Sequence, residues 1–184
     1  MIELKNLCVS FGEQSVLRNF CASIPTDRNT AIYGASGSGK TTLLRLLLGL
    51  IRPDAGTITG TERSVLSAVF QEDRLLPWLT AAENVALVSD MHTAERLLAR
   101  LRLNEAMQER PGQLSGGMKR RVAIARALAF PCDLLLMDEP FNGLDTEAKE
   151  MTARVILDAK KPVVLVTHNR EDAALLAVET VVTL

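Results

Sequence analysis

Apolar and polar residues alternate along the first part of the chain. Residues 2–11 and 16–24 show this alternation in part, which is typical of strands that bury one face. A turn is predicted between them, at residues 12–14, and a second turn over residues 53–60, which hold one proline and two glycines. The chain is therefore expected to begin with an antiparallel β part.

Four short apolar runs follow, each of a length that suits a strand. Those at residues 134–137 and 163–166 contain only leucine, valine and methionine, as expected for strands buried on both faces of a parallel sheet. The other two runs are residues 30–33 and 65–70.

Helical patterns lie between these runs, over residues 43–50, 80–110, 118–130 and 146–159. Thr80 and Glu83 have the spacing of a capping box that starts a helix. Because strands alternate with helices, the pattern predicts an α/β fold with a mostly parallel sheet. We expect one domain over residues 1–184, with the mostly helical residues 72–128 as a subdomain inserted into it.

The charge balance and the apolar runs of the chain argue against nucleic-acid binding and against a membrane-spanning segment. The chain carries 21 Lys and Arg against 22 Asp and Glu, so the basic excess of a nucleic-acid-binding protein is absent and no nucleic-acid partner is expected. No apolar run approaches the ~18 residues of a membrane span, and residues 1–7 do not resemble a secretion signal. Any role at a membrane is therefore expected to depend on a partner.

The cysteines Cys8, Cys21 and Cys132 are odd in number and form no CxxC pair. This spacing argues against disulfides and against a zinc site. We expect three buried thiols in a protein of the reducing cytosol.

The most specific motif is the glycine-rich stretch GASGSGKT at residues 34–41. It lies between a predicted strand and a predicted helix, which is the context that a phosphate-binding loop requires. Backbone N–H groups of such a loop turn toward an anion, and the start of the helix adds its positive dipole end. We therefore expect Lys40 to contact the β- and γ-phosphates of a nucleotide, and the Thr41 hydroxyl to bind Mg²⁺.

Two acidic residues, Asp138 and Glu139, follow the apolar run at 134–137. A carboxylate at the end of a buried strand is costly unless a cation or a donor meets it, so we expect Asp138 to hold Mg²⁺. Neighbouring residues of a strand point to opposite faces. Glu139 is therefore expected to polarise the water that attacks the nucleotide.

A third motif, residues 114–118 with the sequence LSGGM, precedes a predicted helix and by itself would be only a helix N-cap. Together with the other two motifs, it strongly resembles the ABC (ATP-binding cassette) ATPase family over nearly the whole chain. Residues 34–42 match the Walker A loop, 134–138 match Walker B, and 114–118 match the LSGGQ signature with Met118 in place of Gln. The remaining family motifs are matched by Phe11 (A-loop), Gln71 (Q-loop), residues 142–145 (D-loop) and His168 (switch histidine).

The resemblance implies a role for each matched residue. Glu139, His168, Lys40 and Gln71 are expected to be catalytic, with Glu139 as general base. Thr41, Gln71 and Asp138 are expected to arrange Mg²⁺. The residues expected to bind ATP are Phe11, Gly34, Ala35, Ser36, Gly37, Ser38, Gly39, Lys40, Thr41, Thr42, Ser115, Gly116, Gly117 and Asp145. Phe11 would stack on adenine, with a core aromatic at a strand end as the alternative.

The resemblance also implies partners. In the family, two cassettes enclose two ATP molecules, and the phosphate loop of one faces the signature of the other. We therefore expect a second copy of the chain or a paralogous cassette, an integral membrane permease and, indirectly, a solute-binding protein. The chain would lie in the cytoplasm, on the inner face of the cell membrane.

Residues 69–78, VFQEDRLLPW, are similar to a segment in the ATPases of nitrate, sulfonate and taurine importers. This similarity implies import of a small anion. Trp78 would suit a groove that docks the permease, although Leu75, Leu76 and Trp78 would equally suit the packing of the subdomain. A soluble cassette, such as one of iron–sulfur cluster assembly, stays as an alternative. Because the sequence ends soon after His168, we expect the strands that close the sheet in the family to be missing.

Overall fold

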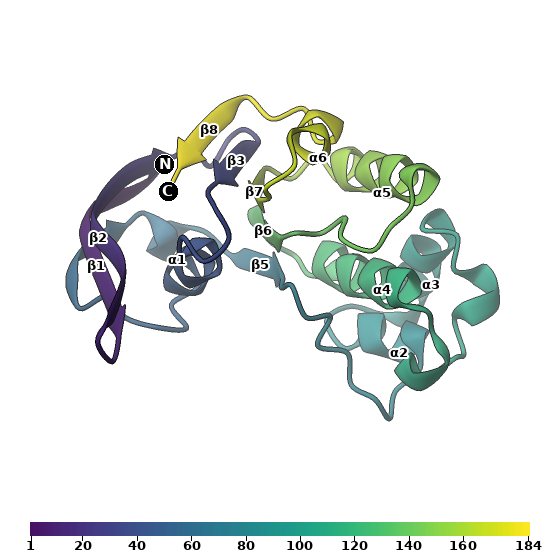
Figure 1. Cartoon of the computed structure of the whole chain (residues 1–184). Coiled ribbons are helices and arrows are strands. Elements are labelled where there is room, and N and C mark those ends of the chain that lie inside the picture. Colours follow the sequence, from purple (N-terminus) through teal and green to yellow (C-terminus); the bar gives the residue numbers. More distant parts are fainter.

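The structure is a computed structural model that describes residues 1–184, leaving aside the side chain of Arg63. Figure 1 shows a small β part at one side, a second sheet in the middle and a group of helices at the other side. Both chain termini lie in the half of the molecule that holds the small β part.

The small β part is an antiparallel sheet of three strands in the order β2-β1-β4. β1 (Ile2–Phe11) and β2 (Gln14–Ile24) form the predicted hairpin. The predicted turn at 53–60 is wrong, because Ala55–Thr59 form β4 and pair with β1. Gly56 allows this pairing, since a Cβ there would lie 2.4 Å from the Asn6 carbonyl oxygen.

The middle sheet has five strands in the order β5-β6-β7-β3-β8, and every neighbouring pair is parallel. The strands are β3 (Thr30–Tyr33), β5 (Leu66–Val69), β6 (Leu134–Asp138), β7 (Val163–Val166) and β8 (Thr180–Thr183). The parallel sheet is therefore confirmed. The expectation that the strands that close the sheet are missing is wrong, because β8 follows β7 in the chain and pairs with β3 along its whole length.

Six α-helices connect these strands: α1 (Lys40–Leu47), α2 (Ala81–Ala86), α3 (Met91–Arg100), α4 (Gly116–Ala129), α5 (Thr146–Asp158) and α6 (Arg170–Leu175). Three short 3₁₀ turns add η1 (Thr61–Arg63), η2 (Asn104–Ala106) and η3 (Pro111–Gln113). The capping box of Thr80 and Glu83 is confirmed at the start of α2. The predicted helix over 80–110 is instead divided into α2, α3 and the turn η2.

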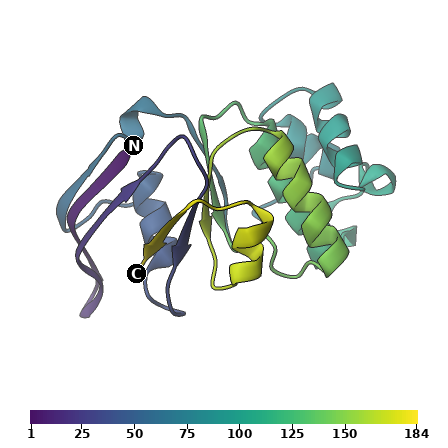
Figure 2. The same cartoon turned by 90° about the horizontal axis from the view of Figure 1, so that it is seen from above.

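The parallel sheet separates two hydrophobic cores. On β6, Leu134 and Leu136 face one core with α1 and the antiparallel sheet, whereas Leu135 and Met137 face the other core with the helices. Figure 2 shows the resulting layers, with α1 enclosed between the two sheets and α5 and α6 on the opposite side of the parallel sheet. Because both faces are covered, these strands can be apolar throughout.

Two expectations from composition have different outcomes. Among the helices that the structure describes, none has both the length and the apolar character to cross a membrane. The expectation of three buried thiols is wrong, because Cys21 is exposed and Cys8 and Cys132 are partly exposed. Cys21 lies on β2, the edge strand of the antiparallel sheet, where side chains alternate between the core and the solvent.

Candidate functional site

The glycine-rich loop, Asp138, Glu139 and His168 meet at one edge of the parallel sheet. β6, β7 and β3 are neighbours, so their carboxyl ends, which carry Asp138, His168 and the glycine-rich loop, lie side by side. In an open α/β sheet this edge is where ligands bind. Figure 1 shows α1 beginning directly at the end of the loop that follows β3.

The glycine-rich loop has the backbone that its sequence requires. Gly37 and Gly39 have φ angles of 79° and 99°, which other residues rarely adopt. Lys40 folds back over the loop, and its ammonium donates to the carbonyl oxygens of Gly34 at 2.7 Å and Ala35 at 2.8 Å. No side chain caps the start of α1. Its first amide groups are therefore left for a ligand or water.

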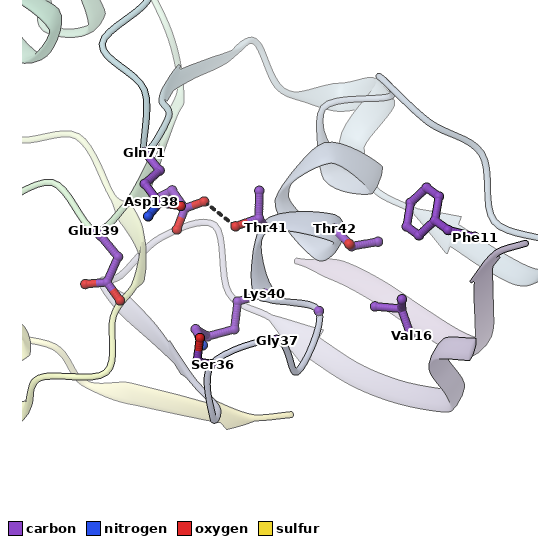
Figure 3. A pocket seen from close by; sticks show the side chains of 11 residues that line it. Phe11, Val16, Ser36, Gly37, Lys40, Thr41, Thr42, Gln71, Asp138 and Glu139 are labelled. Carbon is purple, nitrogen blue, oxygen red and sulfur yellow. Dashed lines mark hydrogen bonds between the residues drawn. The ribbon is translucent and has the colours of Figure 1, made fainter. Parts of the chain in front are cut away.

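Thr41 and Asp138 form the centre of the predicted metal site. The Thr41 hydroxyl donates a hydrogen bond of 2.6 Å to an Asp138 carboxylate oxygen, which Figure 3 marks with a dashed line. Asp138 is only 2% exposed, and this burial raises the pKa of its carboxyl, while the bond from Thr41 partly opposes the rise. A buried carboxylate beside a hydroxyl fits Mg²⁺, which takes oxygen ligands and often only one or two carboxylates.

Glu139 is held by two neighbours from the end of β7. One carboxylate oxygen lies 2.7 Å from Nδ1 of His168, and the other accepts a 3.2 Å hydrogen bond from Thr167. The φ of Glu139 is 47°, an uncommon left-handed value for this residue type. The strand geometry alone did not reveal the role of Thr167, which is fully buried and fixes one face of this carboxylate.

A pocket of about 300 Å³ connects these groups to the antiparallel sheet. Figure 3 shows Glu139, Gln71 and Asp138 at one end of it and Phe11 with Val16 at the other. Phe11 is 52% exposed, so it is not a core aromatic. A second pocket of about 420 Å³ shares Lys40 and Glu139 with the first and is also lined by His168. Val16 was not predicted as part of the site, because only the folded chain brings β2 against Gly39 of the loop.

Besides Ser38, which belongs to the glycine-rich loop itself, four predicted ligand residues line neither pocket: Ser115, Gly116, Gly117 and Asp145. Ser115 caps α4, and its hydroxyl oxygen accepts a 3.3 Å bond from the Met118 amide. Asp145 caps α5 in the same way, with a 2.8 Å bond from Ala148. Within one chain, these residues are therefore not part of the pocket that Lys40 and Asp138 line.

The segment that precedes α2 is fixed by one buried side chain. Asn84 accepts a hydrogen bond from the Leu76 amide at 2.8 Å and donates to backbone carbonyl oxygens, including that of Leu76 at 3.1 Å. Leu75 packs against the core, whereas Trp78 is 64% exposed. Leu75 therefore packs the subdomain, as one interpretation of this segment predicted. Trp78 lies on an open surface, as the docking interpretation requires.

Comparison with known proteins places the chain among transport ATPases. A family model described as ABC transporter matches residues 17–142. The aliphatic sulfonates import ATP-binding protein SsuB 1 of Rhizobium johnstonii is 40% identical, over 98% of this chain and 72% of that protein. The taurine import ATP-binding protein TauB of Pseudomonas putida is 38% identical, over 98% and 77% of the two chains. The nitrate transport protein NasD of Klebsiella oxytoca is 36% identical, over 90% and 72%.

A solved structure has the same fold. The ATP-binding cassette MJ0796, in a dimeric post-hydrolysis state bound to ADP and Pi, matches with a TM-score of 0.89 and 31% identity. The match covers 100% of this chain and 94% of that one.

Proposed function

This chain belongs to the ABC transporter family, and we propose that it is the subunit that binds and hydrolyses ATP to drive the import of a small anion through a separate permease. The observation that carries this proposal is the meeting of the glycine-rich loop, Asp138 and Glu139 at one sheet edge. The soluble iron–sulfur alternative has less support, because the relatives described above are import or transport proteins.

The phosphate end of the pocket binds and aligns the nucleotide. The amides of residues 37–41 and the Lys40 ammonium surround the phosphates, which give Lys40 an anionic partner in place of the two neutral carbonyls. Thr41, Asp138 and Gln71 hold Mg²⁺, which neutralises charge on the phosphates when it is bound. Phe11 and Val16 form an apolar surface for adenine at the other end.

Hydrolysis depends on Glu139 and its neighbours. The carboxylate accepts a proton or a hydrogen bond from the water that attacks the γ-phosphate, and ADP leaves as the bond to its terminal oxygen breaks. Thr167 and His168 hold the carboxylate in one orientation. His168 is also largely exposed, so its ring remains available to the γ-phosphate.

The signature residues act on a different ATP molecule, that of a partner cassette. Ser115, Gly116 and Gly117 begin α4, and a helix of this length presents free amides at its start for an anion. Because they lie outside the pocket of their own chain, they complete a site only in a dimer. Asp145, which caps α5, communicates between the two halves.

The transported solute is a small anion of the nitrate, sulfonate or taurine type, by analogy with the relatives. The permease docks beside the exposed Trp78. A solute-binding protein delivers the anion from the other side. The chain then lies at the inner face of the cell membrane, in the cytoplasm.

The test is Mg²⁺-ATP hydrolysis measured against protein concentration for the wild type and Glu139→Gln. We expect the rate per subunit to rise with concentration, and the substitution to lower it about 100-fold or more, because it removes the base. ATP-dependent dimers of the variant should accumulate in light scattering. Glu95→Gln, which changes an exposed acid on α3, is the matched control.

Two results would contradict the proposal. A rate per subunit that does not depend on concentration would exclude the shared site. Hydrolysis that survives Glu139→Gln would exclude this residue as the base.

A further inference from the structure

Arg120 is a buried arginine whose guanidinium lies against the segment that follows β5. Its side chain is 8% exposed, and Nη1 donates a 2.6 Å hydrogen bond to the Phe70 carbonyl oxygen. Nη2 donates to the carbonyl oxygen of Gln71. Nε lies 3.2 Å from a carboxylate oxygen of Asp73. One side chain thus contacts three residues of this segment, Phe70, Gln71 and Asp73.

Burying a guanidinium is unfavourable unless its donors find partners. Here two backbone carbonyls and one carboxylate supply them, and the planar fork of arginine fits this arrangement better than the single ammonium of lysine. Burial also raises the pKa of Asp73. The Asp73 oxygen that faces Arg120 makes no aligned hydrogen bond among the described residues, so the contact is one of charge.

Arg120 comes from the helix that begins with the signature residues. α4 starts at Gly116 and is capped by Ser115, so Arg120 lies roughly 7–8 Å along the helix axis from the cap. A second arginine of α4, Arg126, donates to the carbonyl oxygens of Asp73 and Arg74, both at 3.0 Å. The helix and the segment 70–74 are therefore joined at several points and form one body.

We infer that Arg120 is a positioning residue that fixes the backbone at Gln71 to α4, so that the Gln71 side chain reaches Mg²⁺ when the signature helix is in place. This inference rests on the role proposed above for Gln71. The side chain of Gln71 is exposed and lines both pockets. Its direction is set by its backbone, and that backbone is held by Arg120.

The arrangement couples two events in one chain. Movement of α4, for example when its start meets the ATP of a partner cassette, moves Gln71 in the chain's own site. Conversely, binding of Mg²⁺ by Gln71 favours one position of α4. Each event biases the same structural element, which is the physical requirement for coupling between sites.

The test compares Arg120→Gln and Arg120→Lys in ATPase assays with Mg²⁺ titrated at saturating ATP. We expect Arg120→Gln to lower kcat and to raise the half-saturating Mg²⁺ concentration, each about 10-fold, as for other residues that orient a metal ligand. For Arg120→Lys, kcat and the half-saturating Mg²⁺ concentration should lie between those of Arg120→Gln and those of the wild type. Binding of a fluorescent ATP analogue in EDTA should not change. Arg154→Gln, an exposed arginine on α5, is the control and should match the wild type.

A double-mutant cycle with Gln71→Ala separates positioning from a purely structural role. If Arg120 acts through Gln71, then Arg120→Gln should add nothing further to the Mg²⁺ dependence of Gln71→Ala. If both Arg120 variants lower the melting temperature but leave the Mg²⁺ dependence unchanged, the inference about Arg120 is overturned, whereas the role proposed for Gln71 is not affected. If Gln71→Ala itself leaves the Mg²⁺ dependence unchanged, the proposed role of Gln71 fails, and the inference fails with it.

Discussion

At the scale of single residues, the Asp138 carboxyl is a buried acid at the centre of the proposed metal site. Burial raises its pKa above the ordinary value of 3.8. The folded protein then binds this proton more tightly than the unfolded chain does. In the absence of Mg²⁺, this group therefore lowers the stability of the fold as the pH rises through the range above 3.8.

Asp138→Asn removes that titration while keeping an oxygen that accepts the Thr41 bond. Without Mg²⁺, we expect the variant to be more stable than the wild type near neutral pH, by roughly 0.5–2 kcal/mol, because functional sites are commonly built at the expense of stability. The difference should shrink at about pH 5 and reverse with Mg²⁺-ATP, which only the wild type binds well. Melting temperatures under these conditions check it. An equal difference at both pH values would contradict the assignment to this carboxyl.

The sequence located those residues of the proposed site whose position follows from their neighbours in the chain. The glycine-rich loop and Glu139 each follow a strand directly and Asp138 ends one, so the motif and its position were visible together. Thr167 and Arg120 could not be found in this way. Their partners lie 28 and about 50 positions away, and only the folded sheet brings them into contact.

At the scale of elements, the C-terminal end of α4 is bound by the ammonium group of one lysine side chain. Lys161, which precedes β7, donates to the carbonyl oxygens of Leu128 at 3.3 Å and Phe130 at 2.8 Å. These groups belong to the last turn of α4 and to its C-cap. A positive charge at this end also opposes the negative end of the helix dipole.

We expect Lys161→Met to lower the free energy of unfolding by roughly 1–3 kcal/mol, because it leaves these partly buried carbonyls unpaired. Urea denaturation followed by circular dichroism measures the change. The adjacent Lys160→Met is the matched control, since Lys160 is exposed. An equal effect of both substitutions would show that the lost bonds do not matter.

The sequence predicted those helices and strands whose pattern of apolar residues is enough to identify them. The buried strands and the long helices α4 and α5 appeared within a few residues of the expected ends. β4 was predicted as part of a turn, because Pro53, Gly56 and Gly60 favour turns and its pairing with β1 is not visible locally. The division of residues 80–110 into α2 and α3 was also missed, since its leucine pattern suits one continuous helix.

At the scale of the whole molecule, the exposed Trp78 lies in the part of the chain between β5 and α2 and lines neither pocket of the proposed site. We expect Trp78→Ser to leave the melting temperature nearly unchanged, because exposed positions contribute little to stability. Co-purification with the permease should fall about tenfold or more, as for a central aromatic of an interface. Leu157→Ser, another exposed apolar residue, on α5, should co-purify normally.

The order of strands also has a consequence for how the protein is made. β3, which leads into the glycine-rich loop, pairs only with β7 and β8 among the strands described. At roughly 5–20 residues per second, the roughly 130 residues between β3 and β7 take roughly 6–26 s to leave the ribosome. During that time β3 has no partner strand, so the nascent chain carries an unpaired apolar segment near its start. Translation speed and chaperone supply should therefore affect the yield of this protein more than that of a chain in which every early strand finds its partner nearby in the sequence.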